Sequence, residues 1–275
     1  MGGDSRTHIP KSYGPKIGRY TVSSPKAPLR RRPSHKSSLE TELLWGWQFD
    51  VYGIKKSWAW GQSQSPVKGS KQKGYVGYIA LKDLTDKSVT SNYKVSVLKA
   101  PLFSKADIKS PIKAHLHLGA LLKANKDSDK FFKLGPGEYI HTNHLRARTL
   151  PPAETDFVSL AEQHSGLPYI WGGLSSDGLD CSGLVQSSLR AAGKDAPRDA
   201  DMQQESLGQL LPIKQSGLKR GDLVFWKGHV GIMTSSRAMI HANAYHMCVK
   251  TEPLAQAARR IKASGGGQIS AIKRF

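Results

Sequence analysis

The spacing of apolar positions changes near residue 148, which divides the chain into two parts with different secondary structure. Before that point, short β-branched and aromatic runs alternate with Gly, Pro and Ser, and this pattern predicts short strands. Apolar residues then recur at helical spacing from Phe157, which predicts a helix over 156–165. Short apolar runs follow from Asp222 and predict antiparallel strands. Residues 156–275 are therefore expected to form an α+β domain.

The part rich in predicted strands contains an internal repeat. The string YTVS begins at Tyr20 and KAPL at Lys26. The matching strings YKVS, from Tyr93, and KAPL, from Lys99, follow 73 residues later. A repeat of this length with strand and turn signals predicts two small all-β barrels, at 19–90 and 91–148.

Two polar segments lie outside the predicted domains. Residues 1–18 are basic, contain two prolines and have no apolar pattern, which predicts a flexible tail. Residues 149–155, TLPPAET, contain two adjacent prolines and predict a linker.

The chain is strongly basic, with 41 Lys and Arg against 21 Asp and Glu, a net charge of +20 and a pI near 10.0. This charge favours an anionic partner such as nucleic acid, an anionic envelope polymer or acidic peptides, or it merely keeps the protein in solution.

No run reaches the roughly 20 apolar residues of a membrane helix, and no apolar leader precedes the first domain. A cytoplasmic protein is expected, with export by a non-classical route as the alternative. Two cysteines exclude a disulfide scaffold and a four-thiolate zinc site.

Cys181 is a candidate nucleophile. The apolar residues of 184–192 fall on one helical face and Gly193 follows them, which predicts a helix that begins at Cys181 with Asp180 as its cap. Unpaired amides and the dipole at a helix N-terminus stabilise a thiolate. The alternative is a small buried residue without chemistry.

His229 and His241 are candidates for the base that a cysteine nucleophile requires. A hairpin turn centred on Ser235 would place the two histidines directly opposite each other on one face. One imidazole could then accept the proton while the other orients it. Half-buried strand residues, or a zinc site with Cys181 or His246, are the alternatives.

Several strings in the C-terminal part occur together in a known family. These are DCSGLVQ from Asp180, PYIWGG from Pro168, GDLVFW from Gly221, HVGIM from His229 and IHAN from Ile240. Residues 156–275 therefore resemble the NlpC-type cell-wall peptidases, which are papain-like cysteine enzymes.

The resemblance implies a role for each matching residue. Cys181 would be the nucleophile and its amide part of the oxyanion hole, His229 the base, His241 the orienting residue, and Tyr169 would lie near the thiol. No metal and no cofactor would be needed. The implied reaction is hydrolysis of the bond between γ-D-glutamate and the diamino acid in peptidoglycan stem peptides.

The two predicted barrels resemble bacterial SH3-like domains, through GYVGYI from Gly74 and LLWG from Leu43. Relatives with this layout bind the free amino terminus of L-Ala-γ-D-Glu-diaminopimelate. Matching position by position, the resemblance implies five substrate-binding residues: Tyr75, Asp180, Ser182, Arg198 and Asp199.

The chain departs from the family pattern at two places. Ala200 stands where the family often has serine, and Gly46-Trp47 where it often has Gly-Glu. Glu42 or Glu40 would then replace the acidic residue that holds the substrate amine.

Three functions are compatible with these observations. The first is a peptidase for small peptides in murein recycling, and the second is a hydrolase of the intact wall polymer. The third is a basic SH3-like binding protein with an inactive peptidase domain. Nucleic acid is the less favoured partner, because barrel aromatics such as Trp45 and Trp60 are more often core residues than stacking platforms.

Overall fold

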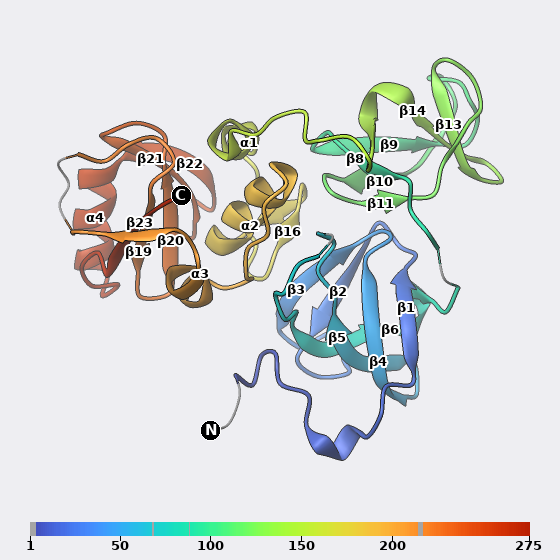
Figure 1. Ribbon diagram of the computed structural model, residues 1–275, viewed down its shortest axis with the longest axis horizontal. Coiled ribbons are helices and arrows are strands. Elements are labelled where there is room, and N and C mark those ends of the chain that lie inside the picture. The colour runs from blue at the N-terminus through green and yellow to red at the C-terminus, as the bar shows by residue number, and fades with distance from the viewer. Residues whose placement is uncertain (1–3, 68, 88, 214–216) are drawn as a thin grey trace. The chain divides into compact units, whose positions relative to one another are not determined.

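The computed structural model describes residues 4–67, 69–87, 89–213 and 217–275 (Figure 1). The chain divides into two compact units, Met1–Pro151 and Pro152–Phe275. The first is all-β and the second contains both helices and strands, in agreement with the expected fold class. None of the helices in the described part of the chain is long and apolar enough to cross a membrane.

The first barrel is a seven-stranded antiparallel sheet in the order β3-β2-β6-β5-β4-β1-β7. Alternate strand residues point inward, and Leu29, Phe49, Val51 and Ile79 are fully buried there. The elements are β1 (Gly18–Val22), β2 (Lys26–Arg30), β3 (Leu39–Leu44), β4 (Gln48–Lys55), β5 (Trp58–Ser63), β6 (Val76–Ala80), the 3-10 helix η2 (Leu81–Asp83) and β7 (Leu84–Thr85).

The second barrel repeats this order of elements. Its strands form a five-stranded sheet, β10-β9-β14-β13-β12, and a three-stranded sheet, β11-β8-β15. Strands β8, β9 and β10 end at the residues that the repeat predicts from β1, β2 and β3. The elements are β8 (Tyr93–Val95), β9 (Lys99–Phe103), β10 (Ile112–His117), β11 (Leu121–Leu122), β12 (Asn125–Lys126), β13 (Phe131–Gly135), β14 (Glu138–His141), η3 (Thr142–His144) and β15 (Leu145–Ala147).

Trp47 joins the two barrels. Its indole Nε1 donates a hydrogen bond of 2.9 Å to the carbonyl of Gly119, and the amide of Leu121 donates one of 2.8 Å to the carbonyl of Trp45. Gly46 lies between these residues with a φ of +77°, and a Cβ atom there would collide with the Leu121 carbonyl. The Gly46-Trp47 departure from the family pattern thus forms a contact between the barrels.

Residues 4–17 contact the first barrel. They include the 3-10 helix η1 (Lys11–Tyr13), and the ring of Tyr13 stacks on Trp60 with 3.6 Å between centroids. The Tyr13 hydroxyl lies 3.2 Å from that of Tyr78. This arrangement differs from the flexible tail that the sequence predicts for residues 1–18, of which residues 1–3 lie outside the described residues.

The C-terminal unit is built on a six-stranded antiparallel sheet, β18-β23-β19-β20-β21-β22. Its helices are α1 (Phe157–Gln163), α2 (Cys181–Ala191), α3 (Ala200–Ser206) and α4 (Leu254–Ala263). Its strands are β16 (Leu174–Ser175), β17 (Gly178–Leu179), β18 (Gln209–Leu211), β19 (Leu223–Trp226), β20 (His229–Met233), β21 (Ala238–Asn243), β22 (Cys248–Pro253) and β23 (Ala271–Arg274).

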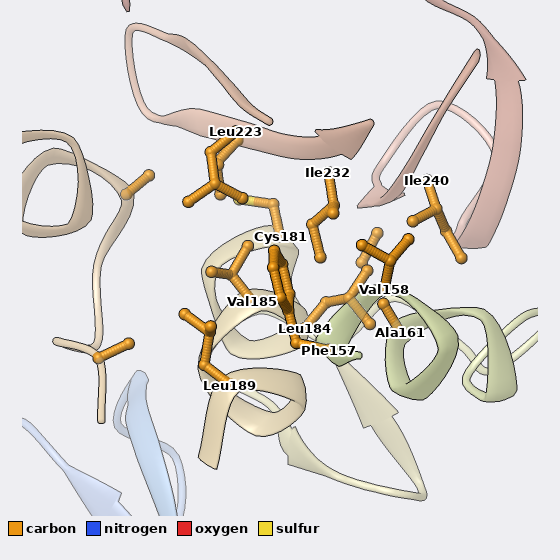
Figure 2. Packing of buried hydrophobic residues seen from close by; sticks show 14 of the residues in the cluster. Phe157, Val158, Ala161, Cys181, Leu184, Val185, Leu189, Leu223, Ile232 and Ile240 are labelled. Carbon is orange, nitrogen blue, oxygen red and sulfur yellow. The ribbon is translucent and has the colours of Figure 1, made fainter. Parts of the chain in front are cut away.

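Both faces of this sheet are covered. Helices α1 and α2 pack on one face, where Leu184 and Phe157 meet Leu223 and Ile232 (Figure 2). Helix α4 packs on the other face, where its apolar residues contact Val224, Trp226, Met233 and Met239. Because both faces are buried, the central strands β19, β20 and β21 are mostly apolar rather than alternating, whereas the edge strands β18 and β22 have exposed polar residues.

Candidate active site around Cys181

Helix α2 begins at Cys181, as the sequence predicts. Asp180 has extended backbone angles, φ −92° and ψ −179°, and its carboxylate accepts a 2.7 Å hydrogen bond from the amide of Gly183. This is an N-cap, which fixes where the helix starts. The thiol therefore lies at the positive end of the helix dipole.

The Cys181 side chain is enclosed by protein. Only 7% of the residue is exposed, and Sγ lies 4.0 Å from the carbonyl oxygen of Gly228. Burial and, to a smaller extent, the charge of Asp180 raise the pKa of the thiol to about 12, against the opposing effect of the amides of Val230 and Ser182. The thiolate that the sequence predicts is therefore corrected to a neutral thiol, because the loss of water outweighs the amides and the dipole.

His229 and His241 form a hydrogen-bonded pair. Nε2 of His229 lies 2.7 Å from Nδ1 of His241. Strands β20 and β21 pair Ile232 with Ile240 and Met233 with Met239, so the histidines lie diagonally across the hairpin and not directly opposite each other as predicted. A Cβ atom added at Gly231 would lie 3.0 Å from Sδ of Met239 and 3.5 Å from the Cβ of His241, so this glycine allows close packing beside the pair.

Both imidazoles are neutral near pH 7. Burial, followed by the neighbouring His241 and Arg260, lowers the pKa of His229 to about 3 against the opposing effect of Glu252. Burial also lowers the pKa of His241, although its hydrogen bond to Glu252 acts in the other direction. A neutral imidazole next to a neutral thiol can act as a general base.

Two functional residues, Glu252 and Arg260, were not predicted from the sequence. His241 Nε2 lies 2.7 Å from Oε1 of Glu252, which is 8% exposed, and Arg260 donates a 2.7 Å hydrogen bond to Oε2. Burial, the largest single effect, acts to raise the pKa of Glu252, but the hydrogen bonds and charges of Arg260 and His241 together outweigh it and lower the pKa. Strand β22, CVKTEP, also contains Lys250 and Thr251, so its sequence gives no local signal for this role of Glu252.

Tyr169 is half-buried against the core of the C-terminal unit. Burial raises the pKa of its hydroxyl, and so do the electrostatic interactions with Cys181 and Asp180. Its amide donates a 3.0 Å hydrogen bond to the carbonyl of Met247. The position is compatible with the predicted role.

Asp180, Ser182 and Arg198 form one buried network. Arg198 donates hydrogen bonds of 2.8 and 2.7 Å to the two carboxylate oxygens of Asp180, and one of 3.0 Å to the hydroxyl of Ser182. Both oxygens of Asp180 thus have protein donors. Asp199 is the residue before helix α3 and is half-buried.

The other predicted substrate-binding residues lie in the N-terminal unit. Tyr75 is buried in the first barrel, and Glu42 is buried with its carboxylate 2.9 Å from Nζ of Lys26. Glu40, the alternative to Glu42, forms an ion pair with Arg31. Binding of a substrate by these residues remains a prediction.

The zinc alternative has no support in the described ranges. Among those residues, no group of three or more His, Cys, Asp and Glu is arranged so that it could hold a metal ion. His246, a possible ligand in that hypothesis, instead lies 3.6 Å from Glu252.

The rate at which iodoacetamide alkylates Cys181 is expected to rise about tenfold per pH unit between about pH 6 and 9, without a plateau. A thiol pKa near 12 makes the thiolate a small fraction that grows with pH. The rate is measured by mass spectrometry in a Cys248→Ala background. A plateau that begins at acidic pH would instead indicate a thiolate–imidazolium pair and contradict the neutral pair.

Family comparison identifies a domain in each unit. Residues 166–260 match the NlpC/P60 family, and residues 29–84 match the bacterial dipeptidyl-peptidase Sh3 domain. The first match contains Cys181, His229, His241 and Glu252.

Two Bacillus relatives are both named gamma-D-glutamyl-L-lysine dipeptidyl-peptidase. The protein from Bacillus subtilis is 38% identical over 95 residues, which cover 32% of this chain and 31% of that protein. The one from Bacillus cereus is 26% identical over 243 residues, which cover 80% of this chain and 72% of that protein. The chain thus spans about a third of the first relative and most of the second.

The fold is also found among solved structures. An NlpC/P60 family protein from Bacillus cereus superposes with a TM-score of 0.75 at 21% identity, covering 94% of this chain and 99% of that one. An NlpC/P60 endopeptidase from Photobacterium damselae superposes with a TM-score of 0.61 at 15% identity, covering 97% of this chain and 73% of that one. At these identities the likeness establishes the fold.

Proposed function

We propose that this protein, a cysteine peptidase with an NlpC/P60 domain at 166–260 and a bacterial Sh3 domain at 29–84, hydrolyses peptidoglycan stem peptides. The bond cleaved is that between γ-D-glutamate and the diamino acid, in peptides with a free N-terminal L-Ala, as murein recycling requires. The observation that carries the proposal is the hydrogen-bonded pair of His229 and His241 beside a cysteine at a helix N-terminus.

The reaction begins with transfer of the Cys181 proton to His229. The sulfur electron pair attacks the γ-glutamyl carbonyl and forms a tetrahedral oxyanion, which the amides at the start of α2 are placed to stabilise. When the oxyanion collapses, the C–N bond breaks and His229 returns the proton to the leaving amine. The product on the enzyme is a thioester.

Water completes the cycle. His229 removes a proton from water, the hydroxide attacks the thioester carbonyl, and a second tetrahedral oxyanion forms. Collapse breaks the C–S bond, and the proton on His229 returns to the sulfur. The free carboxylate of the glutamyl residue leaves, and the neutral thiol and imidazole are restored.

The substrate assignment is supported by the names of the two Bacillus relatives and of the Sh3 family. A dipeptidyl-peptidase removes a dipeptide from a free amino end, which in a stem peptide is L-Ala-γ-D-Glu. Tyr75 and Glu42, together with Asp180, Ser182, Arg198 and Asp199, are the proposed substrate-binding residues. An ammonium that leaves water requires a carboxylate partner, and Glu42 is a candidate.

L-Ala-γ-D-Glu-diaminopimelate is expected to be cleaved at least about a hundredfold faster, in kcat/KM, than the same peptide acetylated on its amine. Loss of one charge-assisted hydrogen bond costs about 1.5 to 3 kcal/mol, and the acetyl group adds bulk at the same place. The two peptides are digested in parallel and the products measured by mass spectrometry, with the L-lysine peptide as a further substrate.

Similar rates on both peptides would contradict the requirement for a free amine. A turbidity assay on intact sacculi then tests the alternative, a hydrolase of the wall polymer.

The net charge of +20 supports one further proposal, that the basic surface binds anionic wall polymer by long-range attraction. That binding would weaken as salt is added.

A further inference from the structure

We infer that Glu252, held by Arg260, is a positioning residue that sets the tautomers of both histidines, so that His229 presents a bare Nδ1 to the Cys181 thiol. The inference rests on the proposed peptidase function and names a residue that acts through His241 rather than on the substrate. The proton positions of the two imidazoles depend on the carboxylate of Glu252.

Glu252 can act only as an acceptor. Arg260 has donors alone, and its guanidinium lies against the carboxylate with Nη1 2.7 Å from Oε2. The pKa of Glu252 is lowered, so the group is ionised at neutral pH. The nitrogen of His241 that lies 2.7 Å from Oε1, Nε2, must therefore carry the proton.

The proton on Nε2 determines the other nitrogen of His241. The imidazole is neutral, because burial lowers its pKa, so Nδ1 has a lone pair and accepts a hydrogen bond. Its partner at 2.7 Å is Nε2 of His229, which must then be the donor. His229 is also neutral, and its one proton is on Nε2, so its Nδ1 is bare and available as a base.

The residues on both sides of His229 contact the thiol. The carbonyl oxygen of Gly228 lies 4.0 Å from Sγ of Cys181, and the amide of Val230 interacts with the same sulfur. The bare nitrogen thus belongs to a residue that the backbone holds beside the nucleophile. Positioning by Glu252 therefore determines which nitrogen is available for the proton.

Because Arg260 lies beside Glu252, the histidine tautomers would reverse if the carboxylate were removed. The guanidinium of Arg260 is held on one side by Glu252 and on the other by the ring of Tyr245, with Cζ 4.3 Å from the ring centroid. Without the carboxylate, these donors would lie next to His241 and favour a bare Nε2 as acceptor. The proton of His241 would then lie on Nδ1, so Nε2 of His229 would have to be the acceptor. The proton of His229 would consequently lie on its own Nδ1, which is the nitrogen that must accept the thiol proton.

Two substitutions of Glu252 distinguish the effect of its hydrogen-bond acceptor from the effect of its negative charge. Glu252→Met removes the acceptor and keeps a side chain of similar length, whereas Glu252→Gln keeps an oxygen that can accept from His241. The matched control is Glu205→Met, which makes the same change at an exposed position of α3. Each protein is labelled with ¹⁵N-histidine for NMR, and peptide hydrolysis is measured in parallel.

The wild-type spectrum is expected to show a proton on Nε2 of both His229 and His241. In Glu252→Met the protons move to Nδ1 of both residues, and kcat falls about a hundredfold or more with KM little changed, since a wrong histidine tautomer alone costs up to about 10⁴-fold in a Ser-His-Asp enzyme. Glu252→Gln keeps the wild-type tautomers and stays within about tenfold of the wild-type kcat. Glu205→Met behaves as wild type.

Two results would overturn the inference: a wild-type His241 protonated on Nδ1, or a Glu252→Met protein with unchanged tautomers and kcat. If Glu252→Met does not fold, the spectra of wild type and Glu252→Gln decide. Failure of the proposed function is recognised separately, because the wild-type protein would then leave the stem peptide uncut while the tautomers still report on Glu252.

Discussion

Cys181→Ala is expected to lower kcat/KM for the stem peptide by about 10⁴-fold or more while the fold stays intact. The sulfur supplies the electron pair for the covalent step, and no other thiol lies at a helix N-terminus in the described part of the chain. Alanine suits the first turn of a helix and fits the space that the cysteine occupies. Peptide hydrolysis and circular dichroism of the variant are measured against wild type.

Cys248→Ala is the matched control. Cys248 is the first residue of β22, where it pairs with Asn243, and it is expected to be inert. His229→Ala should lose nearly as much activity as Cys181→Ala, and His241→Ala less, because an orienting group can be partly replaced. Full activity of Cys181→Ala would refute the peptidase assignment, and equal losses for both cysteine variants would indicate a structural role for the thiols.

The start of α2 could be predicted because its signals are local. The Asp180 cap, the apolar face over 184–192 and Gly193 lie within one short segment. The repeat was predictable for a similar reason, since turn residues and apolar strand positions recur together. In both places, backbone preference and tertiary packing favour the same structure.

The histidine pair was predicted with the correct face but the wrong register. The turn between β20 and β21 is closed by a 2.9 Å hydrogen bond from the amide of Thr234 to the carbonyl of Ala238, which centres the hairpin one residue beyond Ser235. Such a shift changes each pairing by two residues. Because side chains alternate with a period of two, His229 and His241 still share a face.

Some contacts and pKa shifts could not be predicted from the sequence, because they depend on residues that are distant along the chain. Glu252 on β22 contacts His241, and Arg260 on α4 contacts Glu252, so no local spacing indicated them. The pKa of Cys181 depends on burial by segments distant in sequence, which opposes the local effect of the helix terminus. Tyr13 stacks on Trp60 although its own segment has no apolar pattern.

Arg198→Ala is expected to destabilise the C-terminal unit by about 3 to 5 kcal/mol. The side chains of Arg198 and Asp180 are only 5% and 10% exposed, and two hydrogen bonds join them. Removing the guanidinium leaves a buried carboxylate without its cation, next to the helix that carries Cys181. Hydrogen exchange of the α2 amides measures the loss and reports on this unit separately from the barrels.

Arg220→Ala is the matched control, because Arg220 also holds carboxylates but at the surface. It forms ion pairs of 2.9 Å with Asp156 and 2.8 Å with Glu162, and its side chain is 38% exposed. Water replaces those partners when the arginine is removed, so the cost should be about 1 kcal/mol or less. Equal costs for the two variants would contradict this account. The proposed role of Arg198 in substrate binding predicts a raised KM as well, and an Arg198→Ala protein with normal stability and a raised KM would leave substrate binding as its role.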